Sequence, residues 1–306
     1  MHLTLQQLRL FEAVARNRSF TRAAEELFLT QPAVSIQISR LEGGIGSPLF
    51  EQIGKRIYLT AAGREVCQTA RDVLGRLEAL EDALADLHGQ IRGPLQLSVV
   101  TTGKYLLPHL LGAFVRKYPD VTPRLAVTNR AQVIERLRDN VDDMVVMGQV
   151  PQDLPVAARP FLEDVLVMVA HPEHPLAQEK HISLERLLAE RFLVREPGSG
   201  TRMIMDHLFA ERNLRIEPYM ELGSSEAIKQ GVEADLGISV LSLHSLHLEL
   251  SGGYLVVLDV EQFPLKRQWY VVSLKGKRLS LAAQTFIDFL IAEAEAVLRE
   301  HRNRTA

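Results

Sequence analysis

The sequence predicts an α/β protein that carries a small helical segment at its N-terminus. Three observations lead to this. Residues 1–60 hold three closely spaced helical segments, and residues 60–88 form one uninterrupted helical segment with an apolar repeat. After a Gly-Pro break at residue 93, apolar strands alternate with amphipathic helices. At 306 residues the chain is long enough for two or three compact units.

Composition excludes several classes of protein. The chain is 46% hydrophobic and 24% charged, which is ordinary for a globular protein. It has no run of about 18 apolar residues and no basic segment leading into an apolar one at the N-terminus, so we expect neither a membrane span nor a signal peptide. We therefore expect a cytoplasmic protein. The single cysteine, Cys67, allows no internal disulfide and no zinc cluster.

Charge is distributed unevenly along the chain. Residues 1–60 hold seven basic and five acidic residues, a net charge of +2, which leaves −5 on the remainder of a chain whose total is −3. A mildly basic N-terminal segment on an acidic body suits phosphate contact by that segment alone.

The first two helical segments fit a small DNA-reading domain. Apolar positions 5, 8 and 11 outline the first helix, and Ser19 or Phe20 begins the second. Ala23 and Ala24 are small enough to let two helices cross closely. A break at Phe28-Leu29 then separates the second helix from a third, as in a helix-turn-helix.

The third helix has a polar outer face. Thr30 is suited to its N-cap, Pro32 lies in its first turn, and Val34, Ile38 and Leu41 form its buried side. A merely solvated face would usually carry Glu and Lys, and this one has none before Arg40 and Glu42. Amides, hydroxyls and small apolar groups are typical of a helix that reads base edges in the major groove. The predicted DNA contacts are Arg22, Gln31, Pro32, Ala33, Ser35, Ile36, Gln37, Ser39 and Arg40.

A β-wing is predicted next. The residues from Pro48 to Thr60 read as two short strands around Gly54, and Lys55 and Arg56 lie at the tip. We expect these two cations to reach the sugar-phosphate backbone beside the groove.

Residues 60–88 predict a dimerisation helix. Its apolar residues follow alternating steps of four and three, which is the repeat of a coiled coil. The alternative is that this stripe packs on the protein's own N-terminal domain. Cys67 is interpreted as a semi-buried small residue, not a redox switch. The predicted dimer contacts are Val66, Ala70, Val73, Leu77, Leu80, Leu84 and Leu87.

Beyond residue 90, strands and helices alternate, which predicts a mostly parallel sheet. Helices are expected near residues 104–117, 131–139, 183–190, 201–212, 225–234 and 280–301. Strands are expected near residues 95–100, 122–128, 143–147, 165–170, 192–195, 217–222, 237–240, 254–260 and 268–274.

Such sheets bind ligands at the carboxyl ends of their strands, so the polar residues that follow each strand are candidates. The segment from Glu196 to Arg202 carries the main signal, because glycines, hydroxyls and free amides at a helix start suit a carboxylate or phosphate. An ordinary tight turn with a helix cap is the alternative. We expect a small anionic metabolite bound by Thr101, Thr102, Lys104, Asn129, Arg130, Gln149, Ser199, Gly200, Thr201 and Arg202.

No catalytic or metal-binding pattern stands out. His171, His174 and His181 are separated by prolines that prevent their alignment as ligands. Neither a Gly-x-Ser-x-Gly elbow nor a Walker loop occurs. We therefore expect no enzyme, no metal and no catalytic cofactor.

Taken together, the chain resembles the LysR-type transcriptional regulators over its whole length. The resemblance is carried by Phe20-Thr21-Arg22-Ala23-Ala24, Gln31-Pro32-Ala33-Val34-Ser35, Pro48-Leu49-Phe50-Glu51, and Leu59-Thr60 with Gly63. It implies a winged helix-turn-helix over residues 1–60, a linker helix over 61–90 and an effector-binding domain over 91–306. That domain would hold two Rossmann-like subdomains similar to periplasmic binding proteins, I (91–164 and 266–306) and II (165–265), with crossings near Glu163 and Leu265.

The resemblance also implies partners. These are a double-stranded DNA operator, a small-molecule effector that alters DNA bending, and further copies of the chain in a homotetramer; contact with RNA polymerase, and activation versus repression, stay open. Two departures from the family pattern occur. Gln52 stands where Arg is frequent, and Gly43-Gly44 should shorten the third helix.

Within the family, the wing, Val146-Met147-Gly148 and the segment from Arg195 to Arg202 resemble regulators of carbon-dioxide-fixation (RuBisCO) operons. This implies phosphorylated or redox effectors such as sugar bisphosphates, phosphoenolpyruvate or NADPH. Regulation of amino-acid, sulfur or aromatic metabolism is the alternative within the family. A solute-binding protein and an α/β enzyme are the alternative classes. Two expectations argue against a solute-binding protein: the chain has a helix suited to reading DNA, and it lacks a signal peptide.

Overall fold

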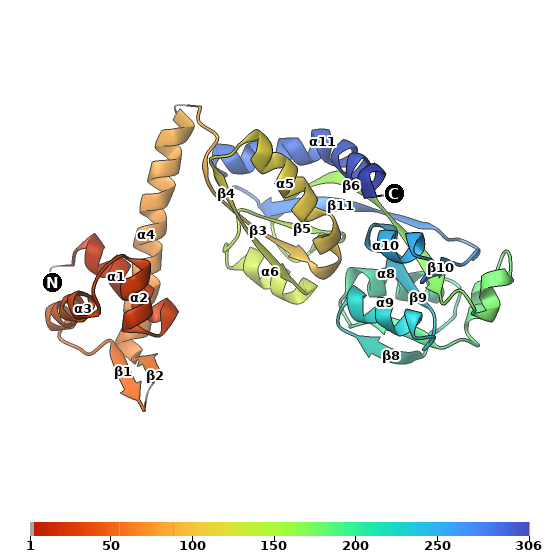
Figure 1. Ribbon diagram of the computed structural model, residues 1–306, viewed down its shortest axis with the longest axis horizontal. Helices are drawn as coiled ribbons and strands as arrows, with labels where there is room; N and C mark the ends of the chain where they lie inside the picture. The colour runs from red at the N-terminus through yellow and green to blue at the C-terminus, as the bar shows by residue number, and fades with distance from the viewer. Residues whose placement is uncertain (1–2, 55, 88, 306) are drawn as a thin grey trace. The chain divides into compact units, whose positions relative to one another are not determined.

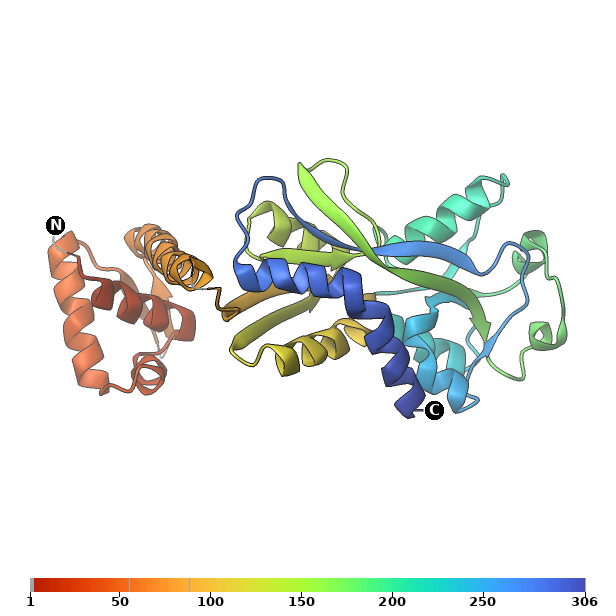
Figure 2. The ribbon, with the colours of Figure 1, turned by 90° about the horizontal axis from the view of Figure 1, so that it is seen from above.

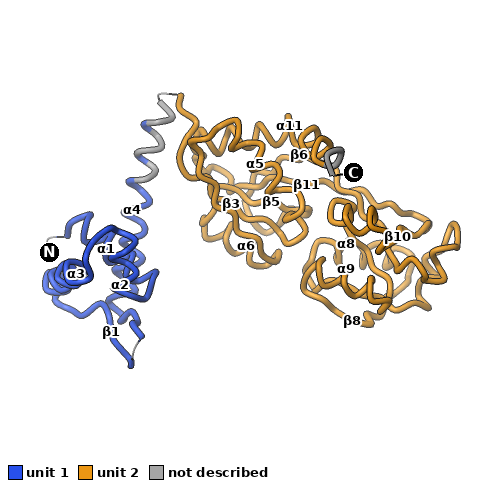
Figure 3. Tube along the Cα trace, viewed as in Figure 1, with its two compact units in different colours: residues 1–88 blue, residues 89–306 orange. Residues whose placement is uncertain are grey.

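The computed structural model describes residues 3–54, 56–87 and 89–305, without the side chains of 78, 79, 81–83, 85–87 and 302–305. The chain divides into two compact units, Met1–His88 and Gly89–Ala306 (Figure 3). The first is called the head and the second the body. The long helix predicted as a separate linker lies within the head. No helix in the described part of the chain is long and apolar enough to span a membrane.

The head contains four helices and a hairpin among its described residues. Ser19 caps the second helix by accepting a hydrogen bond from the Arg22 amide, and Thr30 occupies the N-cap of the third without a side-chain bond. The two strands pair antiparallel. The elements are α1 (Leu5–Asn17), α2 (Phe20–Glu26), α3 (Gln31–Ile45), β1 (Phe50–Ile53), β2 (Arg56–Leu59) and α4 (Ala61–Leu87) (Figure 1).

The expectation that Gly43-Gly44 shortens the third helix is wrong. Helix α3 runs to Ile45 and ends at Gly46, which adopts a left-handed conformation. The Glu42 carboxylate accepts hydrogen bonds from the amides of Leu49 and Phe50 at 2.7 and 3.3 Å. These tertiary bonds hold the last turn, and they outweigh the roughly 1 kcal/mol that each glycine costs in a helix.

Gly63 is required where α4 meets the start of the wing. A Cβ on Gly63 would lie 2.0 Å from the Leu49 carbonyl oxygen. The same carbonyl accepts the Thr60 amide at 3.0 Å, so it cannot move away cheaply. The glycine of the sequence motif is therefore a close-packing residue.

We expect Gly63→Ala to destabilise the head by about 2–3 kcal/mol, because the added methyl must displace backbone. Gly75→Ala is the matched control: it lies in the same helix with nothing within 4 Å of the added Cβ. It should be neutral or stabilise by up to about 1 kcal/mol. Thermal unfolding of the full chain measures both. Equal melting curves for the two variants would contradict this packing account.

Only part of the α4 repeat faces outward. Ala70 is fully buried in the core of the head, and Val66 and Val73 pack against that core. The prediction that Ala70 contacts a partner is thus wrong, because α1 and its neighbours already cover it. Leu77 is half-buried, whereas Leu80 and Leu84 are 55% and 50% exposed. The Leu87 side chain lies outside the described residues.

The body is built on one mixed sheet. Its strand order is β10-β6-β11-β5-β3-β4, with β9 also paired to β6, and β7 and β8 form a separate parallel pair. The strands are β3 (Gly93–Val100), β4 (Val121–Thr128), β5 (Met144–Met147), β6 (Val156–Ala170), β7 (Phe192–Arg195), β8 (Pro218–Leu222), β9 (Ser239–Ser242), β10 (Val256–Val257) and β11 (Leu265–Leu274). The helices are η1 (Thr101–Tyr105), α5 (Leu107–Lys117), α6 (Arg130–Arg138), η2 (Pro175–Gln178), α7 (Leu184–Leu187), α8 (Gly200–Ala210), α9 (Ser225–Glu233), η3 (Leu243–Ser245), α10 (His247–Ser251) and α11 (Leu281–Thr305).

The body has two lobes, which are joined by strands of this sheet. In lobe I, built around β3, β4 and β5, alternate residues of β5 face opposite cores: Met144 and Val146 pack with α5 and α11, whereas Val145 and Met147 pack with α6. In lobe II, built around β7, β8 and β9, the end of β6 does the same. Leu166, Met168 and Ala170 pack with α8, whereas Val167 and Val169 pack with α9. Each lobe is therefore a sheet covered on both faces.

The strands β6 and β11 join the lobes and differ from expectation. They pair antiparallel along their length, so the sheet is mixed and the prediction of a mostly parallel sheet is wrong (Figure 2). Along β6, Leu162 packs in the core of lobe I and Leu166 in that of lobe II. The first half of β6 was not predicted from the sequence; Pro160 lies at a bulge there, and residues 157–160 are exposed.

Candidate functional site

The outer face of α3 presents most of the predicted DNA contacts. Val34, Ile38 and Leu41 are buried, as predicted, at 2% exposure or less. Of the outward residues, Gln31, Pro32, Ile36, Ser39 and Arg40 are exposed, and Ala33, Ser35 and Gln37 are half-buried. The helix thus offers two amides, two hydroxyls and one guanidinium on one side of the head.

The remaining head candidates lie on α2 and the wing. Arg22 on α2 and Arg56 on β2 are exposed, and Lys55 lies outside the described residues. The Gln52 amide donates to the Gly54 carbonyl at 3.0 Å, so it is used within the wing. Phe28, in the turn before α3, has a positive φ of 54° and is 96% exposed.

A polar pocket lies in the body at the ends of several strands. It is lined from lobe I by η1, α6 and the residues after β5, and from lobe II by the loop from β7 into α8. Strand β11 contributes one residue. The lining residues are Val100, Thr101, Thr102, Arg130, Met147, Gly148, Gln149, Arg195, Glu196, Ser199, Gly200, Thr201 and Arg267.

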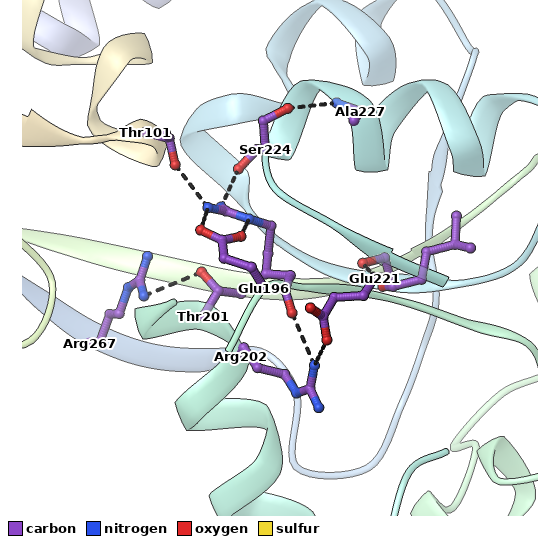
Figure 4. Close-up of polar contacts among 12 residues, drawn as sticks. Thr101, Glu196, Thr201, Arg202, Glu221, Ser224, Ala227 and Arg267 are labelled. Atoms are coloured by element: carbon purple, nitrogen blue, oxygen red, sulfur yellow. Dashed lines mark hydrogen bonds and ion pairs between the residues drawn. The ribbon is translucent and has the colours of Figure 1, made fainter. Parts of the chain in front are cut away.

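Arg195 links the two lobes across this pocket. Its guanidinium donates to Thr101 Oγ1 on η1 at 2.9 Å and to Ser225 Oγ, at the start of α9, at 3.1 Å. It also makes a bidentate pair with Glu196, with N–O distances of 2.7 and 2.8 Å (Figure 4). The side chain is only 5% exposed. Ser224 caps α9 by accepting from the Ala227 amide, which fixes Ser225 beside the guanidinium.

Arg267 is the second buried cation of the pocket. Its Nε donates to the fully buried Asp164 at 2.6 Å, and Ser242 also donates to that carboxylate. Its Nη1 lies 3.5 Å from Thr201 Oγ1, a long contact, and a Cβ on Gly148 would approach its Cζ to 3.2 Å. The guanidinium also lies over the Trp269 ring, 5.5 Å from its centroid, and its terminal nitrogens have no polar partner other than Thr201 among the described residues.

The start of α8 adds a second group of donors beside Arg267. The Ser199 side chain makes no cap bond, so it does not occupy the first-turn amides of this 11-residue helix. Arg130 also lines the pocket, and its buried Nε has no partner among the described residues. These groups together form a site suited to an anion.

Seven of the lining residues were predicted from the sequence, and others were not. The seven are Thr101, Thr102, Arg130, Gln149, Ser199, Gly200 and Thr201. Arg195 was not predicted as a site residue because it belongs to a buried strand, and Arg267 was not because it lies in a strand more than 60 residues from the Gly-rich loop. For Arg195 the available signal was an Arg that ends an otherwise apolar strand, whereas Arg267 stands between Lys266 and Gln268 and carried no such signal.

Three predicted effector residues do not line the pocket. Asn129 caps α6 by accepting from the Gln132 amide. Arg202 pairs with Asp206 and donates to the Arg195 carbonyl. Lys104 pairs with Glu226 at 3.3 Å. Each side chain has partners outside the pocket, which corrects the prediction.

Lys104 belongs to a second cross-lobe network beside the pocket. Tyr105 on η1 donates to Glu226, and the buried Lys229 pairs with Glu226 and Glu249 at 3.3 and 2.6 Å. Burial and the neighbouring carboxylate raise the pKa of Tyr105 far above its usual range. Although burial opposes the change, the Tyr105 hydrogen bond and both lysines lower the pKa of Glu226. This network ties η1 to α9 independently of Arg195.

The described residues contain no group of three or more His, Cys, Asp or Glu side chains that could hold a metal ion. His171 and His174 accept hydrogen bonds from nearby backbone amides in their loop, through their Nδ1 atoms.

Comparison with known proteins gives matches over both units. The family profiles described as "Bacterial regulatory helix-turn-helix protein, lysR family" and "LysR substrate binding domain" match residues 5–64 and 88–295. The chain is 51% identical to the HTH-type transcriptional activator CmpR of Synechocystis sp. and 48% identical to the RuBisCO operon transcriptional regulator of Allochromatium vinosum. Both alignments cover 96% of this chain and 97% of the relative.

A solved structure, the Synechocystis PCC6803 CcmR regulatory domain in complex with 2-PG, is also similar. It is 43% identical, covers 67% of this chain and 98% of that chain, and has a TM-score of 0.64.

Proposed function

Since the chain belongs to the LysR family of DNA-binding transcriptional regulators, we propose that it controls carbon-fixation genes in response to a small acid bearing both a phosphate and a carboxylate. The observation that carries the proposal is the pocket with three arginines and the free N-terminus of α8. The similar CcmR domain was solved with 2-PG, an acid of this kind. The relatives are named regulators, not enzymes.

The described groups divide naturally into two anion positions. Arg267, Thr201 and the first-turn amides of α8 suit a phosphate, because a guanidinium and a helix N-terminus both favour concentrated negative charge. Arg195 and Thr101, across the pocket, suit a carboxylate. A ligand that fills both positions would bridge the lobes, and a change in lobe closure is how we propose that binding reaches the DNA complex.

Isothermal titration of the full chain tests the ligand. The panel comprises 2-phosphoglycolate, 2-phosphoglycerate, phosphoenolpyruvate, ribulose 1,5-bisphosphate and NADPH, with shikimate as a carboxylate that has no phosphate. We expect one of the phosphorylated acids to bind with a micromolar Kd and shikimate not to bind. If none of the three phosphorylated carboxylic acids bound at millimolar concentration, the proposal would be contradicted, whatever the result with ribulose 1,5-bisphosphate and NADPH.

The head is proposed to place α3 in the major groove and the wing beside it. Replacing Arg56 with Gln should weaken binding to all sequences alike and reduce the slope of log K against log salt by about one, since one phosphate contact is lost. Arg71→Gln, an equal charge change on α4, is the control and should leave the slope unchanged. An unaltered slope for Arg56→Gln would remove the wing from the interface.

The proposal also covers how the chain assembles, whether it activates or represses its genes, and where in the cell it acts. We propose that α4 forms a dimer seam through Leu77, Leu80 and Leu84, and that two such dimers associate. Activation is favoured over repression by the name of the CmpR relative. A regulator acts where the chromosome lies, so the chain is placed in the cytoplasm.

A further inference from the structure

The effector pocket is nearly closed by its own side chains. Its free volume is about 20 Å³, which is room for about one water molecule. A phosphorylated acid therefore has to compete with the lining groups for the polar positions of this narrow pocket. Glu196 is the lining group with an anionic charge, and its side chain is only 24% exposed.

The Glu196 carboxylate occupies the position that a ligand carboxylate would take. Both of its oxygens are bound by Arg195, through Nε and Nη2. The other partners of this guanidinium are Thr101 and Ser225. A planar guanidinium binds one carboxylate through this paired edge at a time, so a ligand carboxylate and Glu196 compete for it.

Arg267 is arranged differently. Among the described residues, its one ion-pair partner is Asp164, which is fully buried where β6 crosses between the lobes and which accepts from Nε. The terminal nitrogens are left for the pocket. The first anionic group of a ligand can bind there without displacing a protein carboxylate. Only the second anionic group meets competition.

Resting on the function proposed above, we propose that Glu196 is a specificity-determining internal competitor for Arg195. Acids with two anionic groups can displace it, because the group already held at Arg267 presents the second one at high effective concentration. Inorganic phosphate and simple carboxylates lack that advantage. Glu196 thus lowers the affinity for the effector and excludes abundant small anions from the Arg195 position.

Glu196→Gln tests this inference, because the amide oxygen can still accept one hydrogen bond from Arg195 while the charge is lost. Glu221→Gln is the matched control: Glu221, on β8, faces Arg202 at 3.6 Å and does not line the pocket (Figure 4). Titrations of the full chain with 2-phosphoglycolate, 2-phosphoglycerate, inorganic phosphate and glycolate give the four affinities. The fluorescence of Trp269, the only tryptophan and fully buried, checks that each variant is folded.

We expect Glu196→Gln to tighten binding of a phosphorylated acid and of glycolate by about tenfold, because both place a carboxylate on Arg195. Binding of inorganic phosphate, which uses Arg267, should tighten by less than about threefold. Binding of a phosphorylated acid by the variant alone would also support the inference. The inference would be overturned, with the proposed function left standing, by any of three results. These are the same fold-change in affinity for all probes, unchanged affinities, or the same rise in affinity in Glu221→Gln. Weaker binding would instead make Glu196 a support for Arg195. If neither protein binds any phosphorylated acid, the proposed function fails together with the inference.

Discussion

Replacing Arg267 with lysine is expected to weaken binding of the phosphorylated effector by about 10- to 100-fold while DNA binding without effector is retained. A lysine can still pair with the buried Asp164, so the crossing of β6 and β11 keeps its charge balance. It cannot do so and also present two donors to the pocket, because an ammonium lacks the planar fork of a guanidinium. The loss corresponds to one or two charge-assisted hydrogen bonds.

Arg159→Lys is the control for this variant. Arg159 also lies on the long crossing pair, in β6, but it bonds the exposed Asp288 at 3.0 Å and does not line the pocket. Calorimetric titration should give the wild-type Kd for it. A wild-type Kd for Arg267→Lys as well would show that Arg267 does not hold the ligand.

Replacing Leu80 and Leu84 together with glutamate should dissociate the dimer that we propose for α4. The two leucines are about half exposed in the single chain, at the positions where the coiled-coil repeat leaves the core of the head. Burying them against a partner removes apolar surface from water, at roughly 1.5–3 kcal/mol for each side chain. Four glutamates in one seam would reverse this. We expect the dimer Kd to rise at least about a thousandfold.

Sedimentation velocity at micromolar concentration measures this change. Gln68→Glu with Gly75→Glu adds the same charge at two exposed positions on the opposite side of the repeat, and this pair should leave the dimer intact. A dimer that persists in the Leu80 and Leu84 variant would move the interface elsewhere.

Local signals in the sequence predicted most of the head correctly. The buried stripe of α3, the N-cap positions and the two short strands around Gly54 all depend on neighbouring residues, and they agree with the structure. The length of α3 was misjudged because the bonds from Glu42 to Leu49 and Phe50 span seven and eight residues. The dimer role given to Ala70 was wrong for a similar reason, since its burial comes from helices elsewhere in the head.

In the body, each strand could be predicted more readily than its partners. Residues that directly follow a strand, such as Thr101 and Gln149, were correctly assigned to the pocket. Arg267 reaches it from β11, and its orientation depends on Asp164, which is 103 residues away in sequence. Periodicity carries no information on such a pairing. The antiparallel course of β6 and β11 was missed for the same reason, because strand direction is a long-range property.

The most direct test of the account is a nuclease footprint of the full chain on genomic fragments that it selects, with and without 2-phosphoglycolate or 2-phosphoglycerate. We expect protection of two half-sites at moderate salt, and a change in protection or in the hypersensitive positions between them when the acid is added. Arg267→Lys should keep the first footprint and lose the change. The proposal of an effector-responsive regulator would be contradicted by protection without sequence preference. It would also be contradicted by a specific footprint that does not change although the acid binds.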